Sequence, residues 1–224
     1  MLAADPDLIA RWARAWAISR GAAMPVARDN GLYIHVDQPD QIGRYIFAQV
    51  NVDAIRPLAA RIDRPLLYLK VCAPAEAVRP ILPPGWEIAT PGYMMTAPLS
   101  VMLDRPPVVP AEFAIRITHQ DSITFAHIDD AAGEEAARGR IVAVDGLIVF
   151  DRIRTAEQHQ RRGLGSAIMR ALAAEADKLG VREAMLCATP AGRELYTALG
   201  WQLHSGYTTA SLAPREESSV LAPQ

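Results

Sequence analysis

The sequence predicts a mixed α/β fold (α+β in arrangement) in which a mostly antiparallel sheet is flanked by helices. Apolar residues that alternate with polar ones indicate several successive strands within residues 113–155. The pattern then changes to a helical period over residues 166–179, where the residues expected to face inward are Ile168, Met169, Leu172, Ala176 and Leu179. Two further strands, at 183–188 and 201–212, enclose a short helix at 191–199.

Turn and capping residues mark the ends of these elements. Asp145-Gly146 is a strong hairpin signal between two of the strands. Gly180 fits a stop after the long helix, and Thr189-Pro190 fits a cap followed by proline at the first helical position. The sequence therefore predicts the order strand, helix, strand, helix, strand over residues 147–211.

The N-terminal part of the chain predicts a second α/β arrangement. A helix over residues 5–19 has Asp5 as its cap and Gly21 as its stop, and strands and further helices follow it. Residues 43–98 repeat the order strand, helix, strand, helix, strand with slight sequence identity, so an internal duplication is a hypothesis.

A Pro-rich stretch at residues 105–110 is the best candidate for a boundary between two parts of the chain. We therefore expect an N-terminal α/β segment at 1–105 and a second domain at 106–214. The polar residues 215–224 are expected to form a flexible tail.

Composition narrows the class of protein. Half of the 224 residues are hydrophobic, 21% are charged, and the formal net charge is −2, which is typical of a globular protein without a basic field for nucleic acid. No apolar run approaches the roughly 20 residues that cross a bilayer, and the N-terminus lacks a leader pattern. We expect a cytoplasmic protein that binds neither nucleic acid nor membrane, with Cys72 and Cys187 as buried, reduced thiols that lack metal-site spacing.

The most informative stretch enters the long helix and reads Gln160-Arg161-Arg162-Gly163-Leu164-Gly165-Ser166. A loop that enters a helix offers free backbone N–H groups and the positive end of the helix dipole. Its glycines permit close approach of a ligand and its arginines add positive charge, so the stretch predicts a diphosphate cradle. It is neither a Walker A loop nor a dinucleotide-binding GxGxxG loop, and the alternative is an ordinary glycine-containing loop.

Two motifs at the appropriate separation resemble those of one family. Gln160-x-x-Gly163-x-Gly165 matches the [Gln/Arg]-x-x-Gly-x-[Gly/Ala] motif of the GNAT N-acetyltransferase superfamily. The phrase AGRELYTALGW, at residues 191–201, is similar to the A-x-x-L-Y-x-x-x-G-F ending of that family. The resemblance covers residues 113–211 and implies a GNAT-type mixed sheet that binds acetyl-coenzyme A (acetyl-CoA).

The resemblance also implies which residues form the site. Backbone groups of Ile153, Arg154 and Thr155, on a strand that splays from its neighbour, would bond the pantetheine arm. Tyr196 would protonate the departing thiolate after direct attack of an amine on the thioester, and a core aromatic is its alternative role. The diphosphate would lie on the loop that comprises Gln160, Arg161, Arg162, Gly163, Leu164, Gly165 and Ser166.

The general base departs from the family pattern. Some members carry a glutamate on the strand before the loop, whereas this chain has Val149-Phe150 in that region. Asp151 is the candidate instead, because strand alternation puts it on the same face as Ile153 and Thr155. It could act directly or through a water.

Each candidate base also has a structural explanation. A salt bridge to Arg152 or Arg154 is the alternative role for Asp151. His127 and Glu157 are weaker candidates, because a surface histidine and a loop acid are common.

The acceptor site is expected to come from the N-terminal segment. Usual family members insert two helices between the first two strands, and residues 113–145 leave no room for them. Segment 1–105, read as a degenerate GNAT-like half, would then supply the missing wall. Its aromatic residues could line an acceptor pocket or pack in the core; they are Trp12, Trp16, Tyr33, Tyr45 and Trp86.

The resemblance implies an acetyl-CoA-dependent N-acetyltransferase for a small amine or an amino-acid-like acceptor. Two alternatives stay open at this point. One is a non-catalytic acyl-CoA-binding or regulatory module, and the other is an enzyme that acetylates a protein or peptide. A homodimer also stays open.

Overall fold

The computed structural model describes residues 3–213. The expected tail at 215–224 lies outside the described residues. The helices are α1 (Pro6–Arg20), α2 (Val52–Arg61), α3 (Ala75–Val78), α4 (Leu164–Lys178) and α5 (Pro190–Ala198), with 3-10 turns η1 (Arg79–Ile81), η2 (Leu99–Met102) and η3 (Glu157–His159). The strands are β1 (Val26–Arg28), β2 (Gly31–Gln38), β3 (Gln41–Phe47), β4 (Leu67–Val71), β5 (Trp86–Ile88), β6 (Gly92–Pro98), β7 (Ala114–Gln120), β8 (Ile123–Asp129), β9 (Glu135–Val144), β10 (Leu147–Thr155), β11 (Glu183–Ala188) and β12 (Gln202–Leu212).

These strands form one mixed sheet, and most of its pairs are antiparallel. The order is β1-β2-β3-β4-β12-β6-β11-β10-β9-β8-β7, with β5 paired to β12. Only β3 with β4 and β10 with β11 run parallel, and α2 and α4 connect these two pairs. The mixed α/β fold with a mostly antiparallel sheet is therefore confirmed.

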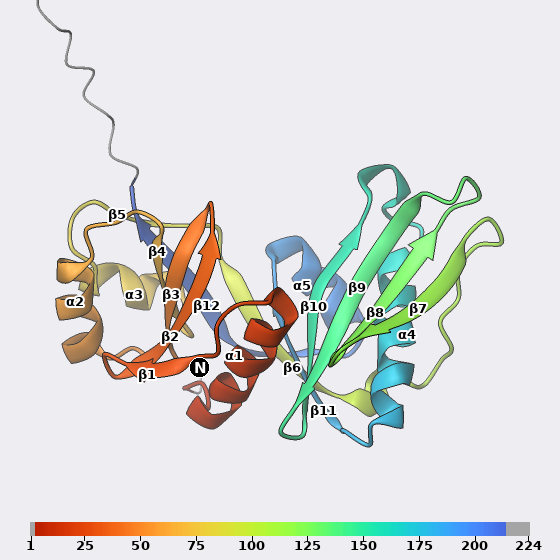
Figure 1. Ribbon diagram of the computed structural model, residues 1–224, viewed down its shortest axis with the longest axis horizontal. Helices are drawn as coiled ribbons and strands as arrows, with labels where there is room; N and C mark the ends of the chain where they lie inside the picture. Colours follow the sequence, from red (N-terminus) through yellow and green to blue (C-terminus); the bar gives the residue numbers. More distant parts are fainter. Residues whose placement is uncertain (1–2, 214–224) are drawn as a thin grey trace, which may run out of the picture.

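The sheet has two halves that exchange their last strands (Figure 1). In each half a parallel β-α-β unit is followed by a short helix and a further strand. Strand β6 follows the first unit but pairs with β11 of the second, and β12 follows the second unit but pairs with β4 of the first. The repeated order expected from the sequence is present, and the exchange joins the two halves through β6 and β12.

Helix α1 lies between the halves and covers one face of the second. The Asp5 side chain accepts hydrogen bonds from the first turn, and Gly21 ends the helix with φ of 62°. The buried face of the helix includes Trp12 and Trp16, which belong to one core cluster with Val149 of β10. Burial of a large apolar side chain contributes about 1.5–3 kcal/mol, so this helix is held by its packing.

Helix α4 covers the opposite face of the second half, against β8, β9 and β10. Ile168, Met169 and Leu172 are fully buried there. Leu179 is 57% exposed, so the expectation that it faces inward was wrong. The reason is local: α4 ends at Lys178, and Leu179 is the cap before Gly180, whose φ is 71°.

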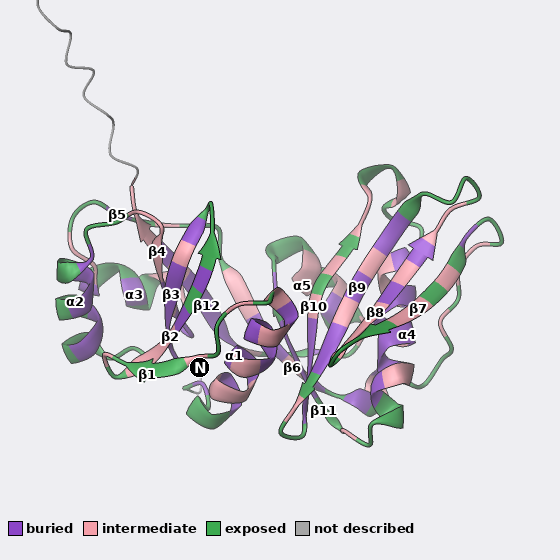
Figure 2. Ribbon diagram, in the orientation of Figure 1, coloured by how far each residue is buried: buried purple, intermediate pink, exposed green. Residues whose placement is uncertain are grey.

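The burial of residues agrees with this arrangement of strands and helices (Figure 2). The three residues of edge strand β1 are all exposed, whereas central strands β6 and β11 carry mostly buried or half-buried residues. Within residues 3–213, no helix combines the length and the hydropathy of a membrane span. No helix interrupts the run from β7 to β9, as the sequence predicted.

Candidate active site

The parallel strands β10 and β11 separate part-way along their length. Their pairing runs from Leu147 with Glu183 to Phe150 with Leu186 and stops there. A pocket of about 600 Å³ opens beyond that point. It collects all but one of the predicted site residues, namely Asp151, Ile153, Arg154, Thr155, Gln160, Arg161, Gly163, Leu164, Gly165, Ser166 and Tyr196.

A β-bulge in β10 changes the predicted orientation of Ile153 and Thr155 relative to Asp151. Pairing with β9 shifts between Asp151 and Arg154, and Arg152 has a φ of 52°. A bulge of this kind adds one residue and reverses the alternation beyond it. Asp151 therefore faces α1, whereas Ile153 faces α4, where the backbone of Gly139 is in close contact with it. The expectation that Asp151 shares a face with Ile153 and Thr155 was wrong for this reason.

The loop before α4 has the geometry of an anion cradle. Arg161 and Gly163 both have positive φ, 60° and 81°, which turns successive backbone N–H groups toward one side. No side chain caps α4, although Asp5, Asn51 and Thr189 cap the other helices of nine or more residues. The N–H groups at the start of this 15-residue helix are therefore free to bind an anionic ligand.

The two loop glycines have different roles. A Cβ on Gly163 would meet open space, so that position is defined by its positive φ and by the pocket beside it. A Cβ on Gly165 would lie 3.1 Å from Leu195 Cδ2, so that glycine permits close packing of α4 and α5. The side chain of Arg162 is not in the pocket: it pairs with Glu112 and its guanidinium lies 4.6 Å from the Phe113 ring centroid.

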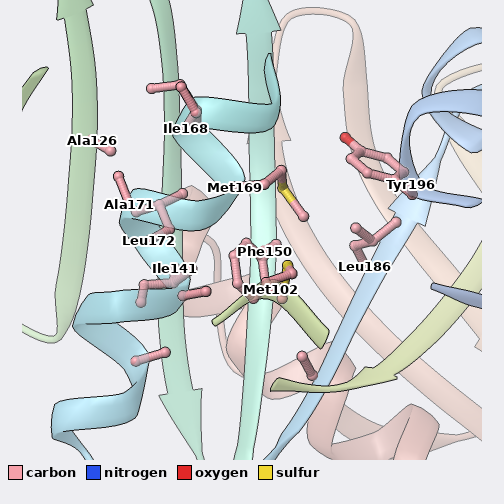
Figure 3. Packing of buried hydrophobic residues seen from close by; sticks show 14 of the residues in the cluster. Met102, Ala126, Ile141, Phe150, Ile168, Met169, Ala171, Leu172, Leu186 and Tyr196 are labelled. Atoms are coloured by element: carbon pink, nitrogen blue, oxygen red, sulfur yellow. The ribbon is translucent and has the colours of Figure 1, made fainter. Parts of the chain in front are cut away.

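Tyr196 of α5 lies at the edge of the core and lines the pocket. Its ring contacts Trp201, with centroids 6.1 Å apart, and it packs over Gly192, where a Cβ would lie 3.1 Å from a ring carbon. Figure 3 shows its hydroxyl oxygen directed away from neighbouring Leu186. Burial raises the pKa of the phenol, so Tyr196 keeps its proton at neutral pH and can donate it.

Asp151 is held by three side chains. Ser19 Oγ donates to Oδ2 at 2.6 Å, and Arg20 Nε and Nη2 donate to Oδ2 and Oδ1 at 2.6 and 2.7 Å. Arg140 Nη2 lies 3.3 Å from Oδ2. Burial opposes ionisation, but these hydrogen bonds outweigh it and hold the pKa of the carboxyl below its ordinary value. The ion-pair partners are Arg20 and Arg140.

A second pocket, of about 310 Å³, adjoins the first. Half of its lining comes from segment 1–105, including Trp12 and Trp16. The other aromatic candidates pack elsewhere, with Tyr45 and Trp86 buried in the core of the first half and Tyr33 against them. The residues common to both pockets are Arg20, Phe150, Asp151, Cys187 and Thr189.

The remaining candidates fall in different places. His127 Nδ1 lies 2.8 Å from Glu135 and lines neither of these pockets. Glu157 lines a third pocket, which adjoins the first and shares Arg154, Thr155 and Gln160 with it. Thr189 caps α5 by accepting from Gly192 N at 3.1 Å and also lines both pockets. Cys187 is exposed, so the expectation that it is buried was wrong: it follows the last residue of β11 that pairs with β10.

Comparison with known proteins shows which protein family the second half of the chain resembles. Residues 120–203, which contain the cradle, Asp151 and Tyr196, match the model of the acetyltransferase (GNAT) domain. The chain carries a GNAT acetyltransferase domain. Such a domain uses an acyl-CoA as the donor of an acetyl group, so acyl-CoA-dependent acetyl transfer is the general activity that the fold supports. No curated protein matches the chain in sequence.

Solved structures share the fold at low identity. The GCN5-related N-acetyltransferase from Kribbella flavida has a TM-score of 0.66 at 16% identity, with 93% of this chain and 97% of that one covered. A tandem GNAT protein from the clavulanic acid biosynthesis pathway has a TM-score of 0.56 at 13% identity, with 83% and 79% covered. A putative GNAT acetyltransferase from Novosphingobium aromaticivorans has a TM-score of 0.53 at 16% identity, with 85% and 92% covered.

The first half differs from the GNAT domain at the equivalent loop. Residues 48–50, between β3 and α2, read Ala-Gln-Val and contain no glycine. The side chain of Asn51 then caps α2 by accepting from Ala54 N at 3.0 Å. A side chain thus occupies the N-terminus of α2, whereas the N-terminus of α4, its equivalent in the GNAT domain, is left free. This difference agrees with a first half that is a degenerate GNAT-like half.

Sequence reasoning did not identify three cations at the site. Arg20 ends α1, Arg44 lies on β3 and Lys70 lies on β4, and all three line the second pocket. No local motif distinguishes them, because the sheet order brings them to the GNAT domain from the other half. The one available signal was a charged residue within an apolar strand, as in the runs RYIF and YLKV.

Proposed function

We propose that this protein transfers the acetyl group of acetyl-CoA to the amine of a small molecule. The observation that carries the proposal is the shared wall of the two pockets, which includes Asp151 and Arg20. One pocket contains the glycine loop of the GNAT domain, and half of the lining of the other comes from the first half. A donor in the first and an acceptor in the second would meet at this wall.

The residues of the first pocket fit acetyl-CoA. The free N–H groups between Arg161 and Ser166 would bind the diphosphate, and the absent Cβ of Gly163 leaves space for it. Beyond Phe150 the backbone of β10 no longer pairs with β11, so groups of Ile153, Arg154 and Thr155 can bond an extended pantetheine arm. When bound, acetyl-CoA supplies a thioester that an amine can attack.

Tyr196 would act on the leaving sulfur. Its raised pKa makes full proton transfer less favourable but keeps the hydroxyl available as a hydrogen-bond donor. A thiolate needs little assistance to leave, so a donated hydrogen bond is sufficient.

Asp151 would act on the amine. It is the one carboxylate in residues 3–213 that lines both pockets, because Glu194 lines the first pocket alone. Its lowered pKa favours the ionised form, which stabilises the positive charge that develops on the attacking nitrogen. The lowered pKa makes Asp151 a weak base, so it would take the proton directly or through a water and pass it on to solvent.

The size of the second pocket favours a small acceptor. A volume of about 310 Å³ is at the lower end for small-molecule sites, which span roughly 300–1,000 Å³. A protein or peptide acceptor needs more room, whereas here α1 and the first half form one wall of a small pocket.

Thiol release tests this proposal. Purified protein would be incubated with acetyl-CoA and a panel of amino acids, diamines, arylalkylamines and a peptide with a free N-terminus, and free coenzyme A would be measured with a thiol reagent. The signal from the two cysteines of the chain is subtracted with a sample that lacks acetyl-CoA. We expect release with a small amine and none with the peptide. Tight coenzyme A binding in calorimetry, with no amine-dependent release, would instead identify a non-catalytic binding module.

A further inference from the structure

We propose that the second pocket binds its acceptor by a carboxylate, through Arg44, Lys70 and the hydroxyl of Tyr207. The inference rests on the proposed function for the amine end of the acceptor, but the anion site stands on its own observations. It would make the substrate class an amino acid or another small amino-carboxylate.

The charges of the pocket are unbalanced. Its lining contains three cations, Arg20, Arg44 and Lys70, and one carboxylate, that of Asp151. Asp151 is already paired with Arg20 and Arg140. Neither Arg44 nor Lys70 forms an ion pair with a carboxylate anywhere in residues 3–213. The pocket therefore has positive charge that the described chain does not neutralise.

Arg44 is the most constrained of these cations. It is 8% exposed, donates from Nη2 to Gln41 Oε1, and lies over the Trp16 ring, with 3.7 Å from its guanidinium carbon to the ring centroid. Its Nε is buried without a hydrogen-bond partner. A buried guanidinium without a counter-charge is unfavourable, and a carboxylate bound in the pocket would supply that charge.

Tyr207 offers a second donor that lacks a partner. It is 5% exposed, its ring meets Trp12 edge-on with centroids 5.5 Å apart, and its hydroxyl is buried close to Arg44 without a hydrogen bond of good geometry. Lys70 Nζ lies 5.8 Å from the centroid of the same ring and donates to Thr209 Oγ1 at 2.8 Å. Only one of the three protons of this ammonium has an assigned partner.

Sheet register brings these donors to one face. Lys70 pairs with Ile46 of β3 and with Thr209 of β12. Residues two apart on a strand share a face, so Arg44 is on the same face as Ile46, and Tyr207 is on the same face as Thr209. Both residues are therefore on the face of the sheet that carries Lys70. Three adjacent strands thus present a guanidinium, an ammonium and a phenol to one pocket, which is a built site for a carboxylate.

The pocket also orients an amino-carboxylate. Its shared wall with the cofactor pocket holds Asp151, which suits the amine end of the acceptor. The indoles of Trp12 and Trp16 supply an apolar wall for the remainder. An acceptor bound by its carboxylate at Arg44 would then direct its amine toward the thioester.

Two kinds of measurement test the proposal. Calorimetry on protein saturated with coenzyme A compares phenylacetate with phenylacetamide, which have the same ring but differ in charge. Kinetics compares each amino acid in the panel with its amide and with the amine that lacks the carboxyl group. We expect the carboxylate to be preferred about tenfold to a hundredfold in both, the range for hydrogen bonds to charged groups.

Variants assign the preference to the site. Arg44→Gln and Tyr207→Phe should each remove most of the preference for phenylacetate over phenylacetamide. Tyr207→Phe removes a buried hydroxyl that lies close to Arg44 but forms no hydrogen bond of good geometry, so the unfolding temperature should change little while binding is lost. The matched controls are Arg56→Gln and Tyr68→Phe, whose polar atoms bond backbone carbonyls outside the pocket.

The outcomes separate this inference from the proposed function. Turnover of amines or amides with no preference for a carboxylate would overturn the anion site and leave the acetyltransferase standing. Absence of turnover with every amine would count against the acetyltransferase, and calorimetry would still decide the anion site. Equal binding of phenylacetate and phenylacetamide would overturn the anion site, and so would phenylacetate binding that Arg44→Gln leaves unchanged.

Discussion

Arg20, the last residue of α1, forms a two-point ion pair with Asp151 on β10, with N–O distances of 2.6 and 2.7 Å. The two residues are 131 positions apart in the sequence. Both line the two pockets, so the pair fixes the end of α1 against the strand that carries the proposed cofactor contacts. It also fixes Trp16, whose ring lies 5.4 Å from the Arg20 guanidinium carbon.

Asp151→Asn should reduce both stability and turnover. The change leaves Arg20 and Arg140 without their counter-charge in a half-buried position, which destabilises by about 1–3 kcal/mol. We expect kcat/KM for the amine to fall more than tenfold, with coenzyme A affinity within a few-fold of the original. Denaturant unfolding and steady-state kinetics measure the two effects.

A second ion pair between α1 and the second half provides the control. Arg14 pairs with Asp145 at 2.5 Å, but the Asp145 side chain is 62% exposed. Asp145→Asn should therefore change stability by less than about 1 kcal/mol. The lowered pKa of Asp151 stabilises the fold above the unfolded pKa, near 4, and this contribution is lost as pH falls through the lower, native pKa. Equal stability of the two variants at pH 7 would contradict the structural importance of the Arg20 pair.

Local signals in the sequence predicted the elements well. Asp5 and Gly21 bound α1, Thr189 caps α5, and Gly163 begins α4 with positive φ. Each of these features depends on the side chain or the φ of one residue and on its neighbours within one helical turn. The glycine-containing loop before α4 could be recognised for the same reason, and its role as a diphosphate cradle stays a prediction.

The composition of the second pocket could not be predicted in this way. Arg44 and Lys70 reach the GNAT domain because β12 and β6 join the two halves, and sheet order is a property of the whole chain. The bulge at Arg152 likewise depends on its pairing with β9. A single added residue moved Ile153 and Thr155 to the face opposite Asp151, and strand alternation alone cannot predict that.

Tyr196→Phe should lower kcat about tenfold to a hundredfold, with coenzyme A affinity unchanged. The ring and its packing against Gly192 stay, and the donor to the leaving sulfur is lost. Tyr207→Phe offers a contrast, because it should raise KM for the carboxylate acceptor and leave kcat largely intact. Single-turnover kinetics at saturating amine separates the two variants. An unchanged rate for Tyr196→Phe would assign the residue to the core alone.

Gly163→Asp should abolish coenzyme A binding. The new side chain would enter the open space beside the N-terminus of α4 and bring a negative charge to the proposed diphosphate position. Gly133→Asp is the matched control, because Gly133 has a φ of 83°, open space around it and no place in the cofactor pocket. Calorimetry should show undiminished binding for the control. Binding by Gly163→Asp at the original affinity would refute the cradle.

Lys70 is the group of the second pocket that we expect to titrate near neutral pH. Burial, with Arg44 nearby, lowers its pKa to about 7. The other groups that face it keep their charge in this range. Arg44 stays positive, because a guanidinium keeps its proton in proteins, and burial raises the pKa of the Tyr207 phenol, which stays neutral.

Phenylacetate should therefore bind more weakly as pH rises from 6 to 8, because the anion favours the protonated form of Lys70. The ligand itself titrates near pH 4 and stays charged throughout this range (about the value of a side-chain carboxyl). Lys70→Met should bind weakly at every pH. Without ligand, this variant should be more stable than the natural protein at pH 7. The pKa of Lys70 is about 7 in the folded protein and 10.5 in the unfolded chain, so between these values the unfolded chain binds the proton more strongly, and this destabilises the natural protein. That difference should shrink as pH approaches 10, and thermal unfolding across this range measures it. A pH-independent affinity in the natural protein would exclude Lys70 from the anion site.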